Sequence, residues 1–471
     1  MGYIDTQLFI DGKWQAPAEG KTLPVMNPAT GKEIGRVAHA GRPDLDRALE
    51  AARKGFEVWR DMVPAERSKI MRKAAALVRE RAGEIAPLLT QEQGKPLAQA
   101  QFEVGGSIAA FRHFGAQVLH PETLVDEPDS LVVEHYAPLG VVGCIVPWNF
   151  PVILLAIKVS IALSTGNTVV AKPAPTTPLT AALLGEIAAG ILPPGVFNVI
   201  IDANDLGGML SSHPDVAKIS FTGSTATGRK VMASAAATLK RLTLELGGND
   251  VAIVLDDADP AEVAAKVYAA ATFNAGQTCM AAKRLYVPNS MLDDMSERLA
   301  ALASATVLGD GLEPGTQMGP IQNRMQFEKL QDLMAATQGE GTVLTGGTLL
   351  NRPGYFIQPA IVRDLADDAR LVTEEQFGPL VPLLSYDTIE DVIARANASD
   401  YGLGGTVWGK DLDKAAAVAR GIETGTVWIN KHLDLRFDVP FGGVKQSGLG
   451  REQGQAGLKE FVDARIVNMA R

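Results

Sequence analysis

The sequence predicts an α/β protein with more than one hydrophobic core, and three observations support that prediction. The chain has 471 residues, about three times the ~150-residue size at which single domains tend to stop growing. From residue 139 onward, short runs rich in β-branched residues alternate with helical patterns, which is typical of consecutive βαβ units. The 47 glycines and 27 prolines indicate many turns in a folded chain and not disorder.

The first part of the chain is expected to be mainly helical. Residues 44–118 contain Ala-rich amphipathic stretches with a Gly-Lys-Pro break at 94–96, so we expect helices that pack around the first sheet. Residues 131–136 alternate valines with polar residues, as an exposed hairpin does. Because an open strand edge usually finds a partner, this hairpin predicts a homo-oligomer, either a dimer or a tetramer.

Two sets of strands and helices follow, joined near residues 247–248. The first set comprises a strand at 168–172, a helix at 179–189, a strand at 218–222, a helix from about 225 and a strand at 241–246. The second comprises a strand at 251–255, a helix at 261–273, a strand at 284–287 and a helix at 291–303. The sequence therefore predicts two α/β units in tandem.

Composition argues against several classes of protein. The chain has 44 Lys and Arg against 54 Asp and Glu, a net charge of −10, and no basic block, which argues against nucleic acid or an anionic membrane as partner. Two cysteines are too few for a disulfide framework, and the six histidines form no metal-binding motif. We therefore expect no metal and a reducing compartment.

Residues 1–17 lack the pattern of a signal peptide. The apolar stretch 152–163 is too short to span a bilayer and contains Lys158, so it is interpreted as a buried helix in a cytoplasmic protein.

Cys279 is the candidate nucleophile. Small and polar residues precede it at the end of a predicted helix, and a strand follows, so it is expected in an accessible loop that suits a reactive thiolate. The other cysteine, Cys144, lies in an apolar strand and is interpreted as an inert core residue.

A thiolate that attacks a carbonyl needs a donor for the oxyanion and, for hydrolysis, a base for water. Asn149 lies between two prolines directly after a predicted strand and is a candidate donor; a simple Asn turn is the alternative. Glu245 lies between leucines at a strand end, where desolvation would raise its pKa toward that of a useful base. A buried, paired structural Glu is the alternative there.

Residues 221–228 resemble an anion-binding cradle, because their glycines permit close approach and a helix N-terminus follows. The glycines at 448, 450 and 454 have a spacing closer to a dinucleotide-binding fingerprint. No β-rich strand precedes them, so we discount that second match.

Together these segments resemble the aldehyde dehydrogenase superfamily over essentially the whole chain. Seven motifs occur in that family's order: PWNFP at 147–151, KPA at 172–174, FTGS at 221–224, LELGG at 244–248, GQTC at 276–279, EQFGP at 375–379 and PFGG at 440–443. The resemblance implies a Rossmann-like NAD(P)-binding domain at 1–119 and 139–247 and a second α/β catalytic domain at 248–446. It also implies a small β oligomerisation arm and C-terminal tail at 120–138 and 447–471.

The resemblance implies oxidation of an aldehyde to a carboxylic acid, with hydride transfer to NAD(P)+. Cys279 is expected to form a thiohemiacetal, whose oxyanion is held by Asn149 and the Cys279 backbone N–H, and then a thioester that is hydrolysed with Glu245 as base. Lys158 and Glu452 match a proposed proton-relay pair. A lysine that extends from an apolar helix toward solvent is the alternative for Lys158.

The resemblance also implies the cofactor-binding positions Ile145, Trp148, Lys172, Pro175, Gly223, Ser224, Leu246, Glu375 and Phe377. Lys172 matches the residue that reaches the adenosine ribose, and Glu375 the one that grips the nicotinamide ribose. The family often has a carboxylate three residues after Lys172, where it binds ribose hydroxyls and repels a 2′-phosphate, but here that residue is Pro175. The expected cofactor is therefore NAD or NADP, with NAD slightly favoured.

The implied substrate-binding positions are mostly apolar: Phe150, Leu154, Ile157, Met280 and Phe441. They favour a small-molecule aliphatic or aromatic aldehyde. Arg436 and His432, in the loop at 431–438, keep open a carboxylate-bearing semialdehyde.

Two further alternatives concern the reaction itself. In a phosphorylating or acyl-transferring relative, phosphate or coenzyme A would replace water, and Glu245 argues against that because no base for water is then needed. A crystallin-like structural protein would have lost turnover, yet Cys279 and Glu245 are both present.

Overall fold

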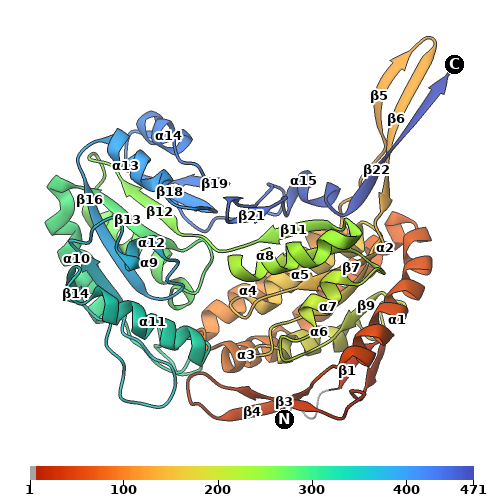
Figure 1. Ribbon diagram of the computed structural model, residues 1–471, viewed down its shortest axis with the longest axis horizontal. Coiled ribbons are helices and arrows are strands. Elements are labelled where there is room, and N and C mark those ends of the chain that lie inside the picture. The colour runs from red at the N-terminus through yellow and green to blue at the C-terminus, as the bar shows by residue number, and fades with distance from the viewer. Residues whose placement is uncertain (1–6) are drawn as a thin grey trace.

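Two large sheets form the body of the molecule, one in each lobe (Figure 1). The computed structural model describes residues 7–471. The eight-stranded sheet has the order β2-β1-β9-β8-β7-β10-β11-β21, and the seven-stranded sheet has the order β14-β15-β16-β13-β12-β18-β19. The chain leaves the first sheet after Glu245 and enters the second at Asp250.

The eight-stranded sheet has five parallel strands at its centre. Its strands are β1 (Leu8–Ile10), β2 (Lys13–Gln15), β7 (Val141–Ile145), β8 (Thr168–Lys172), β9 (Phe197–Val199), β10 (Val216–Thr222), β11 (Arg241–Glu245) and β21 (Gly448–Leu449). Every residue of β7 and β8 is buried, because helices cover both faces of the sheet. That double burial explains why these strands are continuous, mainly apolar runs in the sequence.

Helices pack on both faces of this sheet. One face carries α5 (Pro151–Ser164) and α6 (Leu179–Ala188), with α2 (Pro64–Glu80), α3 (Ala82–Gln93) and α4 (Leu97–Gly115) packed outside them. The other face carries α1 (Arg42–Asp61), α7 (Gly207–Ser212) and α8 (Thr225–Ala235). Nearly all of α5 is buried, as its apolar composition predicts. Within residues 7–471, we find no helix with the length and apolar character that crossing a membrane requires.

The seven-stranded sheet is also covered on both faces. Its strands are β12 (Asp250–Val254), β13 (Ala282–Pro288), β14 (Thr342–Thr345), β15 (Ala360–Arg363), β16 (Leu380–Tyr386), β18 (Gly404–Trp408) and β19 (Thr426–Ile429). The helices α9 (Pro260–Thr272) and α10 (Leu292–Ala305) pack on one face. The other face carries α11 (Arg324–Thr337), α12 (Arg370–Thr373), α13 (Ile389–Asn397) and α14 (Leu412–Arg420).

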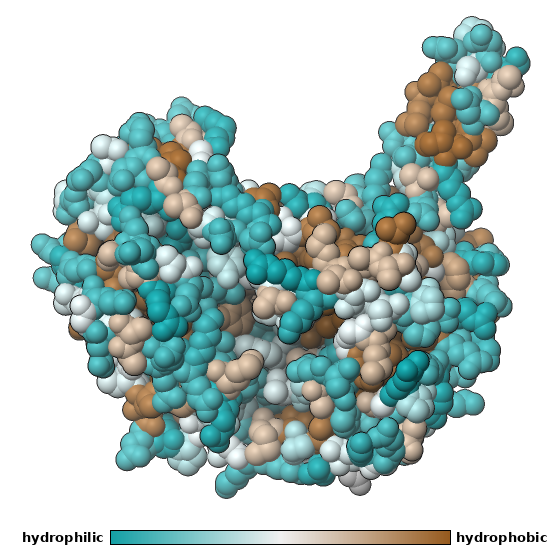
Figure 2. Space-filling view, in the orientation of Figure 1, coloured by the Kyte–Doolittle hydropathy of each residue, from teal (hydrophilic) through white to brown (hydrophobic). Residues whose placement is uncertain are grey.

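A three-stranded arm projects from the body (Figure 1). The hairpin of β5 (Glu122–Glu127) and β6 (Ser130–Pro138) is joined by β22 (Val462–Ala470), which pairs antiparallel with β6 from end to end. Apolar surface gathers on this arm (Figure 2), where Leu124, Ile466, Val467 and Met469 are exposed. Residues 131–136, whose pattern predicted a hairpin, all lie within the single strand β6, and the hairpin partner is β5. This hairpin has β22 on one edge and leaves the outer edge of β5 unpaired within the described chain.

The smaller elements complete the fold. They are β3 (Thr22–Met26) paired with β4 (Glu33–Ala38), β17 (Tyr401–Gly402) paired with β20 (Val444–Lys445), α15 (Gly454–Lys459) and the short 3-10 segments η1 (Ala236–Thr238), η2 (Phe273–Gly276) and η3 (Asn289–Met291). The predicted α/β class is confirmed. The glycine motif near 448–454 runs from the two-residue strand β21 into α15. Because β21 is an antiparallel edge strand and not a parallel strand of a βαβ unit, the motif differs from a dinucleotide-binding fingerprint.

Candidate active site

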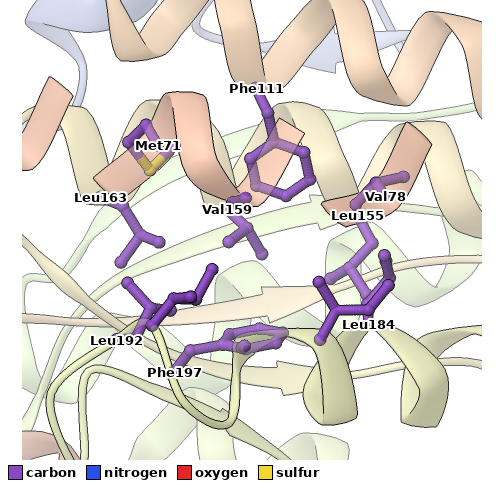
Figure 3. Close-up of a pocket in the computed structure, with 13 residues that line it drawn as sticks. Met71, Val78, Phe111, Leu155, Val159, Leu163, Leu184, Leu192 and Phe197 are labelled. Atoms are coloured by element: carbon purple, nitrogen blue, oxygen red, sulfur yellow. The ribbon is translucent and has the colours of Figure 1, made fainter. Parts of the chain in front are cut away.

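Two cavities of different character lie in the body of the protein. One is a gap of about 30 Å³ between α2, α4, α5 and α6, lined by apolar side chains such as Met71, Phe111 and Leu184 (Figure 3). A void of this size and lining stays dry, so it is a packing gap and not a binding site. The other is an open cleft of about 1200 Å³ whose walls come from the strand ends and loops of the eight-stranded sheet and from the loops and α11 of the other lobe.

The cleft lies at the carboxyl ends of the parallel strands of the eight-stranded sheet. β7 and β10 are neighbours there, and the strand order runs in opposite directions on either side of them. The connections that leave β7 and β10 therefore diverge, and the crevice between them is where α/β proteins bind ligands. Ile145, at the end of β7, and Gly223, after β10, both line this crevice.

Cys279 follows a tight left-handed turn that precedes β13. Asn274, Ala275 and Gly276 have φ angles of 54°, 55° and 70°. A Cβ atom on Gly276 would lie 2.3 Å from the Gly378 carbonyl oxygen, so the turn requires glycine at that position. The turn brings the partly accessible Cys279 side chain to the wall of the cleft.

The surroundings of Cys279 disfavour its anion in the free protein. Burial is the main cause that raises the pKa of the thiol to about 12. The carboxylates of Asp250, Glu375 and Glu245 also raise this pKa, and the ammonium of Lys283 lowers it. The thiol is therefore protonated at neutral pH before substrate arrives. Cys144, by contrast, is fully buried within β7, and burial raises its pKa to about 12 as well.

Asn149 is held directly against the nucleophile loop. Its Nδ2 atom donates a 2.9 Å hydrogen bond to the carbonyl of Gln277, two residues before Cys279. Its backbone carbonyl accepts hydrogen bonds from Lys95 Nζ at 2.8 Å and Asn274 Nδ2 at 3.1 Å. Three contacts thus fix this segment, and they leave one N–H of the Asn149 amide free to donate.

Glu245 is a buried carboxylate without a hydrogen-bond partner. Its side chain is 5% exposed, and neither oxygen is bonded within the described chain. Burial raises its pKa well above 4.5; the carboxylate of Glu452 adds to that effect, while Lys158 and Arg451 oppose it. The alternative of a paired structural Glu is wrong, because an ion-pair partner is absent among residues 7–471.

Lys158 and Glu452 form a buried ion pair. Lys158 lies on α5 and is fully buried, with its Nζ atom bonded to Glu452 Oε1. Ser220 Oγ lies 3.2 Å from Lys158 Nζ and donates to Glu452 Oε1 at 3.1 Å. The alternative that Lys158 extends toward solvent is therefore wrong.

The implied cofactor positions all line the cleft: Ile145, Trp148, Lys172, Pro175, Gly223, Ser224, Leu246, Glu375 and Phe377. Ser224 caps α8 by accepting the Thr227 N–H at 3.3 Å, so the helix N-terminus presents N–H groups to an anion. Glu375 Oε1 accepts the Gly248 N–H at 2.9 Å. A Cβ atom on Gly247 would lie 2.4 Å from Glu375 Oε2. A large cleft with an anion cradle and a carboxylate for hydroxyl groups fits a dinucleotide.

Lys172 does not stand alone in the cleft. Its Nζ atom lies 2.7 Å from Asp202 Oδ1 and donates to Asn204 Oδ1 at 3.4 Å. Asp202 is fully buried, and its other oxygen accepts the Leu206 N–H at 2.8 Å. The positive charge of Lys172 is thus balanced before any ligand binds.

The implied substrate positions divide into two groups, of which only Met280 and Phe441 pack near the nucleophile. Phe150 stacks on Phe273 with ring centroids 6.0 Å apart, and Phe441 packs near Met280 and Cys279. Leu154 is partly buried, whereas Ile157 is 4% exposed and belongs to the core.

The loop at 431–438 presents no free cation. Arg436 forms a two-point ion pair with Asp438, at 3.0 and 2.8 Å. His432 is partly buried and donates from Nε2 to the Met280 carbonyl at 2.6 Å. Burial lowers its pKa to about 4, so it is neutral at physiological pH.

Several buried charged residues of the site escaped the sequence analysis. Asp202, Lys95 with its partner Glu103, and Lys283 all contact segments that the motifs singled out. Lys95 lies in the predicted helix break at 94–96, which is the only sequence signal among them. No cluster of three or more metal-ligating side chains occurs among residues 7–471.

Known proteins resemble this chain in sequence and in structure. A model described as the aldehyde dehydrogenase family matches residues 14–467. Human retinal dehydrogenase 2 is 38% identical, with 98% of this chain and 92% of that protein covered, and chicken aldehyde dehydrogenase 1A1 is 38% identical, with 98% and 93% covered. The NAD+ complex of a Bacillus cereus aldehyde dehydrogenase superposes with a TM-score of 0.97 at 36% identity, covering 99% and 96%. An NAD+ complex of betaine aldehyde dehydrogenase from Staphylococcus aureus gives 0.96 at 33% identity, covering 99% and 95%.

Proposed function

The chain belongs to the aldehyde dehydrogenase family and oxidises an aldehyde to a carboxylic acid with a nicotinamide cofactor, and we propose that Cys279, Asn149 and Glu245 carry out this reaction. One observation supports the assignment above all. Three separate segments contribute a partly accessible thiol, an amide bonded to the thiol's own loop, and a carboxylate with no hydrogen-bond partner in the described chain. These are the nucleophile, oxyanion donor and base that the reaction needs.

The steps follow from these groups. The Cys279 thiol gives its proton to water in the open cleft, and the thiolate then forms a C–S bond to the aldehyde carbon as the carbonyl π electrons move to the oxygen. Asn149 Nδ2 and the Cys279 N–H donate to that oxyanion. When bound, a nicotinamide would accept the hydride whose loss converts the thiohemiacetal to a thioester. Glu245 then takes a proton from water as the water oxygen attacks the thioester, releasing the carboxylic acid and the Cys279 thiolate.

The pair of Lys158 and Glu452 is proposed to receive the proton from Glu245. Both side chains act on the pKa of Glu245, Glu452 raising it and Lys158 lowering it. Their mutual contact and the bridging Ser220 hydroxyl form a buried path that leads away from the base.

Water is the proposed acyl acceptor. A relative that transfers the acyl group to phosphate or coenzyme A needs no base for water, yet Glu245 is unpaired and its pKa is raised. The structural-protein alternative is without support, because the chain belongs to an enzyme family and keeps both Cys279 and Glu245.

Uncharged aliphatic or aromatic aldehydes are the proposed substrates. The stacked Phe150 and Phe273 rings and the nearby Met280 and Phe441 offer apolar contact. A carboxylate-bearing semialdehyde needs a free cation, and Arg436 is already paired with Asp438.

A panel of aldehydes tests this proposal. The rate of oxidation of each aldehyde by the purified protein is measured from the absorbance of the reduced nicotinamide. A kcat/KM for an ω-semialdehyde above that of every uncharged aldehyde would overturn the proposal.

NAD is the proposed preferred cofactor, by a modest margin. Pro175 does not repel a 2′-phosphate, but Asp202 balances the charge of Lys172, so Lys172 offers a hydrogen bond without a net positive charge.

The variant Asp202→Asn tests this. It keeps an oxygen for the Leu206 N–H and removes the negative charge beside Lys172. It is expected to improve the affinity of 2′,5′-ADP by about tenfold relative to 5′-ADP, the scale of one charge-assisted contact. Asp205→Asn is the matched control, because Asp205 is exposed and pairs with His39. Equal ratios in all three proteins, measured by calorimetry, would refute the role of Asp202.

We also propose a homo-oligomer, a dimer or tetramer, formed through the arm, whose open β5 edge and exposed apolar side chains are available to a second copy. Both cysteines are free, which favours a reducing compartment such as the cytoplasm.

A further inference from the structure

Lys283 is a buried cation at the nucleophile loop that the proposed chemistry does not yet use. It lies on β13 and is 4% exposed. Its Nζ atom donates to the Thr278 carbonyl at 2.8 Å and to the Cys279 carbonyl, and it lies 3.7 Å from Glu375 Oε1. A buried ammonium needs such acceptors, because an uncompensated charge is costly away from water. All the acceptors belong to the catalytic loop or to the cofactor-facing Glu375.

The contact with Thr278 has a geometric consequence for Cys279. The Thr278 carbonyl and the Cys279 N–H belong to the same peptide unit, and the described chain contains no cis peptide bond. In a planar trans peptide these two groups point in opposite directions. The Ala281 N–H also donates to the Thr278 carbonyl, at 3.1 Å. Lys283 and this turn therefore hold the carbonyl on one side and aim the Cys279 N–H to the other.

The charges around Cys279 give Lys283 a second consequence. Three carboxylates act against a Cys279 anion: Asp250 from β12, Glu375 from the segment after α12, and Glu245 from β11. Lys283 acts in favour of that anion. Without Lys283, a Cys279 thiolate would lose this attraction and keep the three carboxylates as neighbours in a desolvated setting.

We propose that Lys283 is a positioning residue of the nucleophile loop, which directs the Cys279 N–H toward the substrate oxyanion and stabilises the Cys279 thiolate. The proposal rests on the proposed role of Cys279 as nucleophile. It involves only side-chain and backbone groups of this chain.

The test is the pH dependence of Cys279 alkylation in the cofactor-free protein. Iodoacetamide reacts with the thiolate, and mass spectrometry of the Cys279 peptide gives the rate at each pH. In Lys283→Gln the rate at pH 8 is expected to fall at least about tenfold, the effect of losing one nearby opposite charge. The value of kcat is expected to fall by more than tenfold while the KM for the aldehyde changes little, because the oxyanion forms only after binding.

Two variants separate this role from a purely structural one. Lys329→Gln removes a partly buried lysine beside Glu375, one that donates to the Glu375 carbonyl and not to the nucleophile loop, and its alkylation profile is expected to match the wild type. Lys283→Arg keeps the charge, so its alkylation rate is expected to stay within about threefold of wild type. It also provides the comparison if Lys283→Gln does not fold.

Each outcome decides a definite point. A Lys283→Gln protein that folds and alkylates like wild type overturns the proposal, and so does Lys283→Arg with a tenfold loss of alkylation. If alkylation of Cys279 leaves turnover intact, the proposed role of Cys279 itself is wrong, and Lys283 has nothing to position.

Discussion

Replacing Glu245 by glutamine is expected to separate the two halves of the reaction. The amide keeps the shape of the side chain but cannot take a proton from water. The thioester therefore forms, because that half needs no base for water, and its hydrolysis slows by about 10²- to 10⁴-fold, the usual contribution of a general base. A single burst of reduced cofactor, one equivalent per subunit, is expected before an almost flat steady state.

The same substitution is expected to stabilise the fold. Burial raises the folded pKa of Glu245 well above its ordinary 4.5, so the folded protein resists the ionisation that the unfolded chain undergoes. The penalty is absent below pH 4.5, grows by about 1.4 kcal/mol for each pH unit above it, and stops growing at the folded pKa. Glutamine has no such penalty, and its Tm advantage over wild type is expected to increase as the pH rises from 5 to 7.

Stopped-flow absorbance, intact-mass spectrometry and thermal unfolding measure these three effects on one preparation. The acyl-enzyme is expected as a mass increase that is absent when Cys279 is first alkylated. Full steady-state turnover by Glu245→Gln, or the absence of both burst and acyl adduct, would remove Glu245 from the role of base. A Tm difference that does not change with pH would show that the wild-type carboxylate is not held against its ionisation.

Three further predictions concern other parts of the molecule. Cys279→Ala is expected to abolish oxidation with nearly unchanged cofactor affinity by calorimetry, and residual turnover above about a thousandth of wild type would contradict this. Pro175→Glu is expected to shift the ratio of kcat/KM for NAD to that for NADP in favour of NAD by roughly 1 to 3 kcal/mol, because the new carboxylate accepts hydrogen bonds from the ribose hydroxyls and repels a 2′-phosphate. If wild type already prefers NAD over NADP by more than about ten-thousandfold, another residue determines the cofactor preference. Light scattering at micromolar concentration is expected to show an oligomer that Val467→Glu weakens, since Val467 is exposed on the arm, and a wild-type monomer would refute the proposed interface.

The sequence was informative where burial and chemistry act on neighbouring residues. The central strands β7, β8 and β12 are buried on both faces, so they are continuous, mainly apolar runs that a local pattern can identify. The turn before Cys279 is likewise a local feature, with its glycine and polar residues adjacent in the chain.

Pairings between distant residues were beyond local patterns. Lys172 and Asp202 form an ion pair because β8 and β9 are neighbours in the sheet. A lysine at 172 does not indicate from the sequence alone that it pairs with an aspartate at 202. The pairing of Lys158 with Glu452 spans 294 positions and was expected only through the family resemblance. The role of Lys283 depends on which carbonyls a folded loop turns toward it, and the sequence contains no signal for that.

Burial of both Cys279 and Glu245 looks unfavourable for a reaction that needs two anions in turn. The two steps, however, use these anions in turn. The Cys279 anion attacks the aldehyde, and the Glu245 carboxylate is needed only when the sulfur already carries the acyl group. Burial raises both pKa values, so it opposes each anion in its own step. Lys283 acts in favour of the Cys279 anion. Loss of Lys283 should therefore slow the attack on the aldehyde more than the hydrolysis of the thioester.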